Sequence, residues 1–264
     1  MDEVPFRIIQ ISDTHLFAEA EQVLLGVKTQ QSFDAVVKLL KSEPLPDLII
    51  LSGDLAQDGS QATYLRLADQ LKELPVPIYY VVGNHDDPDN LNAVYPLENI
   101  THHRHIVLKD WHLILLSSYK AGAVEGYLDK TQLSFLEHCL QMYPEHHAIV
   151  VCHHQPVPVG SAWLDRLGLT NAADLWAVLN HFPHVRTVLF GHVHQEHEGE
   201  KNGIRYYSVP STCIQFKPNS AKFALDKLPP GYRWIELFSD GTLKTGIRRA
   251  SEYVGKFDVH AKGY

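Results

Sequence analysis

Five short motifs of aspartate, asparagine and histidine carry the side chains best suited to chemistry in this sequence. Carboxylate, imidazole and amide groups without a thiolate suit borderline-to-hard divalent ions such as manganese, iron or zinc. Two such ions held close together need a bridging carboxylate, for which Asp54 is the natural candidate. The pattern therefore indicates a two-metal site. The motifs are Asp13-Thr14-His15, Gly53-Asp54, Gly83-Asn84-His85-Asp86, His153-His154 and Gly191-His192-Val193-His194.

Each motif alone also has a structural explanation. An aspartate after a strand usually caps a helix or makes a turn, and Asn84 or Gly191 could serve in a turn as well. Five such motifs, each following an apolar run, are hard to explain by packing, because burying many ionisable groups in one region is costly. We therefore interpret them jointly as one functional site. The histidines without an acidic motif are predicted to be structural: His102, His103, His105, His146, His147, His181 and His184.

Alternating strands and helices must bring these motifs together. Each motif then follows the carboxyl end of a strand, where open α/β sheets place their ligands. A hairpin within 106–117 makes the sheet mixed, and Asp240-Gly241 is expected to turn the last hairpin. The apolar periodicity predicts strands near residues 6–12, 48–52, 78–82, 106–108, 113–117, 148–152, 185–190, 205–209, 233–237 and 243–247, and helices near 33–40, 63–74, 130–142 and 172–182.

Local geometry is expected to aim the motif side chains. Asp13 and His15 are one residue apart, so on a strand they would project the same way from the sheet edge. Glycine before Asp54, Asn84 and His192 is expected to let the backbone turn sharply into a crowded site. Two long irregular stretches, 155–170 and 216–230, are candidates for substrate-binding or lid segments.

Composition limits the possible partners. The chain has 264 residues, a hydrophobic fraction of 45% and a formal net charge of −8. We expect one domain over residues 1–264, completed by a strand-rich segment at 205–250. An acidic chain lacks the basic face that binds a nucleic acid polymer. We find no apolar run of membrane-spanning length and no signal peptide, and three widely spaced cysteines suit neither disulfides nor a zinc site. A cytoplasmic location is the expectation.

The ordered motifs D-x-H, G-D, G-N-H-D, H-H and G-H-x-H resemble those of the calcineurin-like metallophosphoesterases across about residues 6–210. The resemblance implies a four-layer α/β/β/α sandwich of two mixed sheets, with the metals above the packed sheets. His153 is preferred to His154 because it comes first after the strand, although either could be the ligand. The implied ligands are Asp13, His15, Asp54 and His194 for one ion, and Asp54, Asn84, His153 and His192 for the other.

Within that superfamily the chain most resembles the bacterial class III cyclic nucleotide phosphodiesterases. This implies hydrolysis of 3′,5′-cyclic AMP to 5′-AMP by a metal-bridging hydroxide, with Fe²⁺ or Mn²⁺ favoured and Zn²⁺ compatible. His85 would protonate the departing oxygen or bind the phosphoryl group. The catalytic candidates are Asp54 and His85, and the substrate-binding candidates are His15, Asp54, Asn84, His85 and His194. The matching stretches are 13–17, 53–58, 153–161, 191–195, 211–218 and 230–234.

Other functions use similar ligands. A protein phosphatase of the superfamily would read G-D-x-x-D-R-G, but Asp58 stands at the arginine position and removes a phosphate-binding cation. A repair nuclease would need a basic face, which the acidic charge does not offer. A phosphodiesterase for 2′,3′-cyclic nucleotides or glycerophosphodiesters would use the same ligands. A non-catalytic metal-binding regulator is the alternative from a different class.

Overall fold

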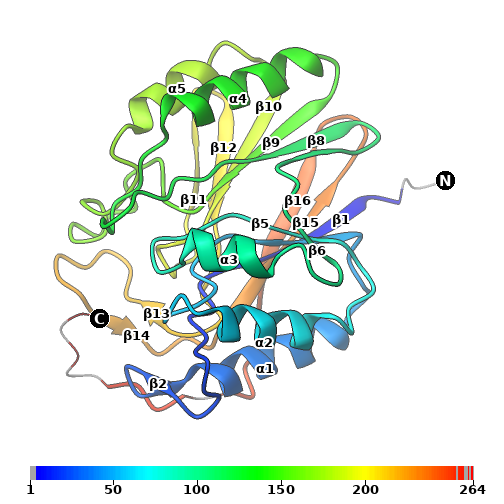
Figure 1. The fold of residues 1–264 in the computed structure, drawn as a ribbon. Coiled ribbons are helices and arrows are strands. Elements are labelled where there is room, and N and C mark those ends of the chain that lie inside the picture. The colour runs from blue at the N-terminus through cyan, green and yellow to red at the C-terminus, as the bar shows by residue number, and fades with distance from the viewer. Residues whose placement is uncertain (1–3, 254, 259–260, 262, 264) are drawn as a thin grey trace.

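The structure is a computed structural model that describes residues 4–253, 255–258, 261 and 263. Two six-stranded sheets form its centre (Figure 1). The first sheet has the order β16 (Leu243–Arg249), β15 (Gly231–Leu237), β1 (Phe6–Ile11), β4 (Leu48–Leu51), β5 (Ile78–Tyr80) and β6 (Ile100–Thr101). The second has the order β11 (Glu198–Lys201), β12 (Ile204–Ser208), β10 (Val185–Phe190), β9 (His147–Cys152), β8 (Trp111–Leu115) and β7 (His105–Val107).

Both sheets mix parallel and antiparallel neighbours, as predicted. In the first sheet, β1, β4, β5 and β6 are parallel, while β15 and β16 pair antiparallel. In the second, β12, β10, β9 and β8 are parallel, with antiparallel strands at both edges. The helices are α1 (Thr29–Lys41), α2 (Gln61–Leu71), α3 (Pro88–Val94), α4 (Lys130–Met142) and α5 (Ala172–Leu179).

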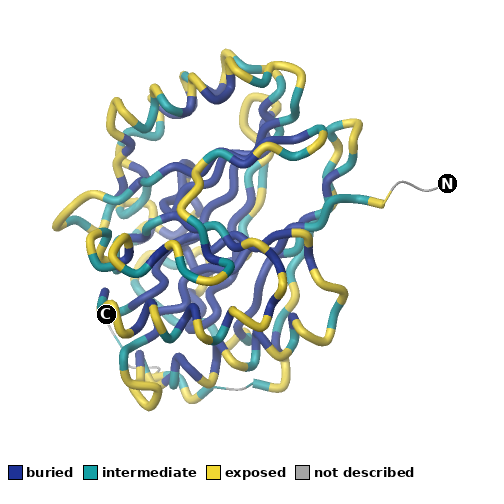
Figure 2. Tube along the Cα trace, turned by 45° about the vertical axis from the view of Figure 1, so that its right-hand side comes forward, coloured by how far each residue is buried: buried dark blue, intermediate teal, exposed yellow. Residues whose placement is uncertain are grey.

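The strands alternate their side chains between two cores, because successive residues of a strand face opposite sides of a sheet. Ile8 and Ile50 pack against Val151 of the second sheet, so the two sheets share a core. Their neighbours Ile9 and Ile49 face α1 and α2 instead. The outer face of the second sheet packs against α4 and α5 in the same way. Figure 2 shows the buried parts of the trace gathered in the interior of the molecule, with exposed parts around the outside. The predicted four-layer α/β/β/α sandwich is confirmed.

Helix positions follow from capping and periodicity. In α1, Phe33, Val36 and Leu40 recur at helical spacing and are all buried. The side chain of Ser60 accepts a hydrogen bond from the main-chain N–H of Thr63 and so begins α2. None of the described helices combines the length and the apolar character of a membrane span.

Most predicted elements lie within two or three residues of the observed ones. The helix at 130–142 and the strand at 185–190 have the predicted limits. The helices predicted at 63–74 and 172–182 end earlier, at Leu71 and Leu179. The short elements α3, β6 and β11 and two small hairpins were not predicted, because each is too short or too polar to show an apolar periodicity. These hairpins are β2 (Val23–Leu24) with β3 (Val27–Lys28), and β13 (Gln215–Phe216) with β14 (Leu225–Asp226).

The strands near the carboxyl terminus join the sheet that begins the chain. β15 lies beside β1, with Ile8 opposite Ile235, and β16 pairs with β15 around the predicted Asp240-Gly241 turn. Gly241 has a φ of +83° there, as such a turn favours. We propose on this basis that the strand-rich segment completes a single domain.

Candidate metal centre

The predicted ligands lie in the loops that follow β1, β4, β5, β9 and β10, at the carboxyl ends of these strands. Three ligand atoms from Asp13, His15 and His194 lie within 4.8 Å of one another. The same holds for Asp13, Asp54 and His153. These five side chains are buried, although each comes from a motif far from most of the others in the sequence. The fold therefore brings the motifs into one cluster.

Asp54 lies at the middle of this cluster. Its Oδ2 atom is 3.8 Å from His15 Nε2 and 3.3 Å from His153 Nε2. Oδ2 is buried and accepts no hydrogen bond among the described residues, whereas Oδ1 accepts one from the main-chain N–H of His85 at 2.8 Å. One carboxylate oxygen is thus held by the protein, and the other is left facing both sides of the cluster.

His15 and His194 face each other on one side of Asp54. Their Nε2 atoms are 3.1 Å apart, and His194 Nε2 is 3.3 Å from Asp13 Oδ1. The carboxylate of Asp13 also accepts the main-chain N–H of His192 at 3.1 Å. On the other side of Asp54, Asn84 Oδ1 lies 3.3 Å from the ring of His153.

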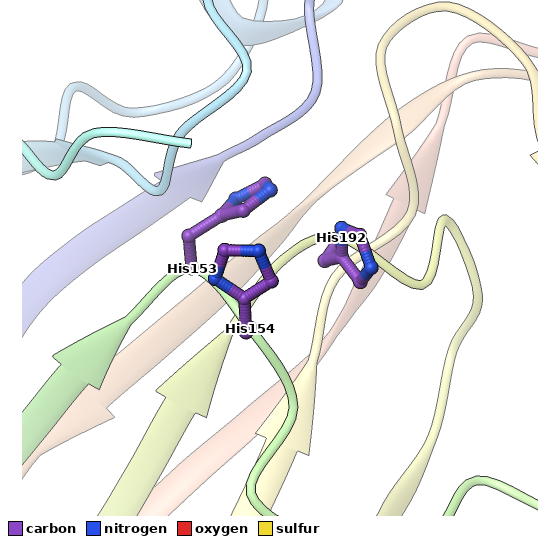
Figure 3. A group of neighbouring side chains, drawn as sticks. All are labelled: His153, His154 and His192. Carbon is purple, nitrogen blue, oxygen red and sulfur yellow. The ribbon is translucent and has the colours of Figure 1, made fainter. Parts of the chain in front are cut away.

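The two neighbouring histidines of the H-H motif have different surroundings. Figure 3 shows their rings leaving the end of β9 toward the side where His192 lies. His153 Nδ1 donates to the main-chain oxygen of Ser52 at 2.8 Å, which directs Nε2 toward Asp54. His154 uses both ring nitrogens within the protein, 2.8 Å from Ser118 Oγ and 2.9 Å from the main-chain oxygen of Val124. This geometry favours His153 as the ligand, although three ligand atoms of His153, His154 and His192 also lie within 4.8 Å.

The hydrogen bonds of the rings test whether the cluster fits a metal ion. A carbonyl oxygen can only accept, so the Nδ1 atoms of His15, His153 and His194 must each carry the proton. In neutral rings the Nε2 atoms then present lone pairs to one another and to the carboxylates of Asp13 and Asp54. Acceptor atoms converging at such distances repel one another unless a proton or a metal cation lies among them. The donor set, all oxygen and imidazole nitrogen, therefore fits divalent metal ions.

The pKa shifts of the clustered side chains also indicate that the site favours positive charge. Burial lowers the pKa of His153, but the facing carboxylate of Asp54 outweighs burial and raises it to about 9. Burial raises the pKa of Asp54, but His153 and its neighbours bring it well below the ordinary value. In contrast, burial lowers the pKa of His154 to about 3, so this ring stays neutral. The cluster thus stabilises ionised carboxylates and attracts cations.

The backbone departs from the strand geometry expected for the first motif. β1 ends at Ile11, and Asp13 and His15 have φ values of 53° and 45°, in the left-handed region. The alternation of a strand is therefore not what brings this pair together, and that explanation was wrong. Asp54, His192 and His194 also have positive φ, at 51°, 64° and 47°. Such conformations cost about 1–3 kcal/mol each and typically occur at functional sites.

A sharp turn was predicted at each of the three glycines that precede Asp54, Asn84 and His192, but one of the three makes it. Gly53 has a φ of +96° and does make such a turn. Gly83 and Gly191 lack a positive φ but allow close approach, because a Cβ there would overlap the main-chain nitrogen of Asp54 or the hydroxyl of Ser12. Packing of the loops, rather than backbone freedom, requires glycine at these two positions.

Asp86 holds two of the metal-centre loops together, a role that the sequence did not reveal. Its Oδ1 accepts the main-chain N–H groups of Leu55 and Ala56 at 3.0 and 3.1 Å, and Oδ2 accepts that of Gly83 at 2.9 Å. Burial and the nearby Asp54 raise the pKa of Asp86 to about 7. Its place in the G-N-H-D motif was the only signal in the sequence.

The two irregular stretches predicted as substrate-binding or lid segments meet beside the centre. Trp163 of the first lies against Phe216 of the second, with ring centroids 5.0 Å apart. Phe216 also stacks on the ring of His194, with centroids 4.2 Å apart and an angle of 8° between the rings. The main-chain N–H of Ser220 donates to Ser161 Oγ at 3.3 Å. The two stretches therefore contact each other next to His194, a predicted ligand. Their role in substrate binding stays a prediction.

Comparisons with known proteins agree with this geometry. The family model for the calcineurin-like phosphoesterases matches residues 6–196. The 3′,5′-cyclic adenosine monophosphate phosphodiesterase CpdA of Escherichia coli K12 is 40% identical, covering 99% of this chain and 96% of that protein. The CpdA protein of Pseudomonas aeruginosa is 39% identical, covering 97% and 94%. A dimetal phosphatase from Danio rerio shares the fold at a TM-score of 0.60 and 15% identity, covering 89% of this chain and 96% of that one.

The family model covers more than half of the chain, and relatives near 40% identity extend over nearly all of it. The resemblance in the ordered motifs is thereby confirmed. The two-sheet sandwich and the buried cluster of aspartate and histidine fit the same conclusion. This chain belongs to the calcineurin-like phosphoesterase family.

Proposed function

We propose that this chain hydrolyses 3′,5′-cyclic AMP to 5′-AMP at a centre of two divalent metal ions. The observation that carries the proposal is Asp54 Oδ2, buried between His15 Nε2 at 3.8 Å and His153 Nε2 at 3.3 Å. An oxygen in that position suits a carboxylate that bridges two ions. The names of the bacterial relatives support the substrate, because they are 3′,5′-cyclic AMP phosphodiesterases that match nearly the whole chain.

The proposed ligands divide into two sets that share Asp54. The short distance between the facing rings of His15 and His194 supports the first set. The contact of Asn84 with His153 supports the second. Iron(II) or manganese(II) suits these oxygen and nitrogen donors, and zinc is compatible with them. The first ion is assigned to Asp13, His15, Asp54 and His194, and the second to Asp54, Asn84, His153 and His192.

When bound, two divalent ions lower the pKa of a water toward neutrality and offset the charge of the phosphate. The water would give up a proton to solvent and its oxygen would attack phosphorus, while the bond from phosphorus to the ribose 3′ oxygen breaks. The released ribose 3′ oxygen must gain a proton to give 5′-AMP. Residues proposed to contact the substrate are His15, Asp54, Asn84, His85 and His194.

His85 is the proposed donor of that proton. Its main-chain N–H is fixed by Asp54 Oδ1 at 2.8 Å, and its ring centroid lies 5.0 Å from that of His15. The side chain is only partly buried, so it lies at the accessible edge of the centre. A titratable ring held there suits proton transfer to a leaving oxygen.

A substrate panel tests the proposed function. The protein loaded with Mn²⁺ or Fe²⁺ should hydrolyse 3′,5′-cyclic AMP with a higher kcat/KM than 2′,3′-cyclic AMP or a glycerophosphodiester. The metal-free protein is the control and should be inactive. Preference for another diester would reject the substrate and keep the chemistry. Protein that binds two ions but leaves even an activated aryl phosphodiester intact would instead be a non-catalytic metal-binding regulator.

A further inference from the structure

The histidines at the metal centre differ in what holds their Nδ1 atoms. In His153 and His194 this nitrogen donates to a main-chain carbonyl, at 2.8 and 2.9 Å. In His15 it donates to Oε1 of the Gln57 side chain, at 2.7 Å. Main-chain carbonyls are fixed by the fold, whereas a side-chain acceptor can be removed by substitution. Of these three rings, His15 is therefore the one whose described Nδ1 acceptor is a replaceable side chain.

The backbone places Gln57 firmly beside His15. The main-chain N–H of His15 donates to the main-chain oxygen of Asp54 at 3.0 Å, and that of Leu16 donates to the main-chain oxygen of Leu55 at 3.2 Å. The main-chain N–H of Gln57 donates back to the main-chain oxygen of Leu16 at 2.8 Å. The loops after β1 and β4 thus run side by side, and Gln57 reaches His15 from the same loop that carries Asp54.

The chemistry of the imidazole ring makes this contact consequential. An amide oxygen only accepts, so the contact keeps the proton of a neutral His15 on Nδ1 and leaves Nε2 as an acceptor. His15 Nε2 is the atom that faces His194 Nε2 at 3.1 Å and Asp54 Oδ2 at 3.8 Å. Without the amide oxygen the proton could move to Nε2, from which it would donate to His194 or Asp54. Such an internal hydrogen bond would compete with a metal ion for the same atoms.

We propose that Gln57 is a positioning residue that holds His15 in the Nδ1–H tautomer and so strengthens binding of the metal ion assigned to His15. The inference rests on the proposed two-metal centre and does not depend on which phosphodiester is the substrate. Hydrogen-bond partners behind metal-ligating histidines typically contribute about 10 to 100-fold to metal affinity. We expect an effect of that size for one of the two ions.

Three variants separate the acceptor from the bulk of the side chain. Gln57→Leu removes the acceptor at similar volume, Gln57→Glu keeps an acceptor oxygen, and Gln57→Asn keeps the amide but shortens its reach. Gln61→Leu is the matched control, because the exposed Gln61 contacts the Asn90 side chain outside the centre. Mn²⁺ binding is measured by equilibrium dialysis with elemental analysis. The tautomer of His15 is read from its ring nitrogen signals by NMR in the metal-free protein, because a metal ion bound to Nε2 would itself place the proton on Nδ1.

The expected result is a loss of about 10 to 100-fold in affinity for one ion in Gln57→Leu, with retention in Gln57→Glu and Gln61→Leu. The Nδ1–H signal of His15 should persist in Gln57→Glu and be lost in Gln57→Leu. Unchanged affinity in Gln57→Leu overturns the inference, and so does an equal loss in Gln57→Glu. If Gln57→Leu does not fold, Gln57→Asn decides in its place, since unchanged affinity there rejects the requirement for the acceptor. Wild-type protein that binds two ions without hydrolysing any diester would reject the proposed function and leave this result standing.

Discussion

Histidine side chains gather in two regions of this molecule, at opposite ends of the parallel strands. The metal centre lies at the carboxyl ends. The other group, the amino-end histidine cluster, consists of His105, His112, His146 and His184, near the beginnings of β8, β9 and β10. His112 is fully buried and lies 3.0 Å from His105, and its ring centroid is 6.0 Å from that of His184. Both regions thus contain closely packed imidazoles.

The two regions differ in what surrounds the rings. At the metal centre the rings of His153 and His194 lie 3.3 Å from a carboxylate oxygen, and a fixed acceptor holds each Nδ1. In the part of the chain that the structure describes, no three ligand atoms of the amino-end histidine cluster come within 4.8 Å of one another. Burial, followed by His105, His184 and His146, lowers the pKa of His112 to about 3, whereas His153 has a raised pKa. A carboxylate and a fixed tautomer, rather than the number of histidines, distinguish a candidate metal site.

The largest expected effect comes from removing the shared carboxylate of the metal centre. Asp54→Asn should lose one of the two metal ions and nearly all activity, because an amide is a neutral and poorer bridging ligand. Elemental analysis and turnover of cyclic AMP measure the two losses. His112→Phe is the control, since it alters the other histidine group and should keep both ions and wild-type turnover. Two ions per chain and near-normal turnover in Asp54→Asn would reject the bridging role.

The same contrast shows what the sequence could and could not predict. The strand and helix order was largely predictable, because the long elements have clear apolar periods and each motif follows a strand. The contacts of Asp86 and Phe216 were not predictable, because they join loops that are distant in the sequence. The left-handed backbone at Asp13 and His15 was missed for a related reason. The contacts between the assembled loops stabilise this left-handed conformation, and no local sequence pattern predicts it.

The second expected effect separates His153 from His154 within one motif. His153→Ala should lose a metal ion, because its Nε2 faces Asp54. His154→Ala should keep both ions and lose only about 10 to 100-fold in activity, as expected for a residue that supports the ligands without contacting a metal ion. Metal content of the two purified variants decides between them. If His154→Ala loses the metal and His153→Ala retains it, the ligand assignment is wrong by one residue.

A third, smaller effect concerns His85, which lies at the metal centre without being an assigned ligand. An alkoxide such as the ribose 3′ oxygen needs a proton as its bond breaks, whereas an activated aryl oxide does not. His85→Ala should therefore lose about 10² to 10⁴-fold on cyclic AMP and far less on an aryl phosphodiester, with both metals retained. Equal losses on the two substrates at unchanged metal content would indicate that His85 binds the phosphoryl group instead.

The smallest expected effect lies in the amino-end histidine cluster and concerns stability alone. Burial lowers the pKa of folded His112 to about 3, below its ordinary value of 6.5. As pH falls below 6.5 the unfolded chain therefore takes up the proton first, and this group costs stability at about 1.4 kcal/mol per pH unit until its folded pKa is reached. In His112→Phe this loss is absent. The variant should still have a constant deficit of about 1 kcal/mol from the lost hydrogen bond to His105.

Urea unfolding of wild type and His112→Phe at pH 7.5, 6.0 and 5.0 measures this difference. Titration of the metal ligands affects both proteins equally, so it cancels when the two free energies of unfolding are subtracted. Wild type should have the higher free energy of unfolding at pH 7.5. This difference should disappear as the pH falls, because only wild type carries the imidazole at position 112. The neighbouring rings of His105, His146 and His184 remain in both proteins. A difference that stays constant over this range would mean that His112 titrates in the folded protein much as it does in the unfolded chain. The proposed contrast between the buried, neutral His112 ring and the charged metal centre would then be rejected.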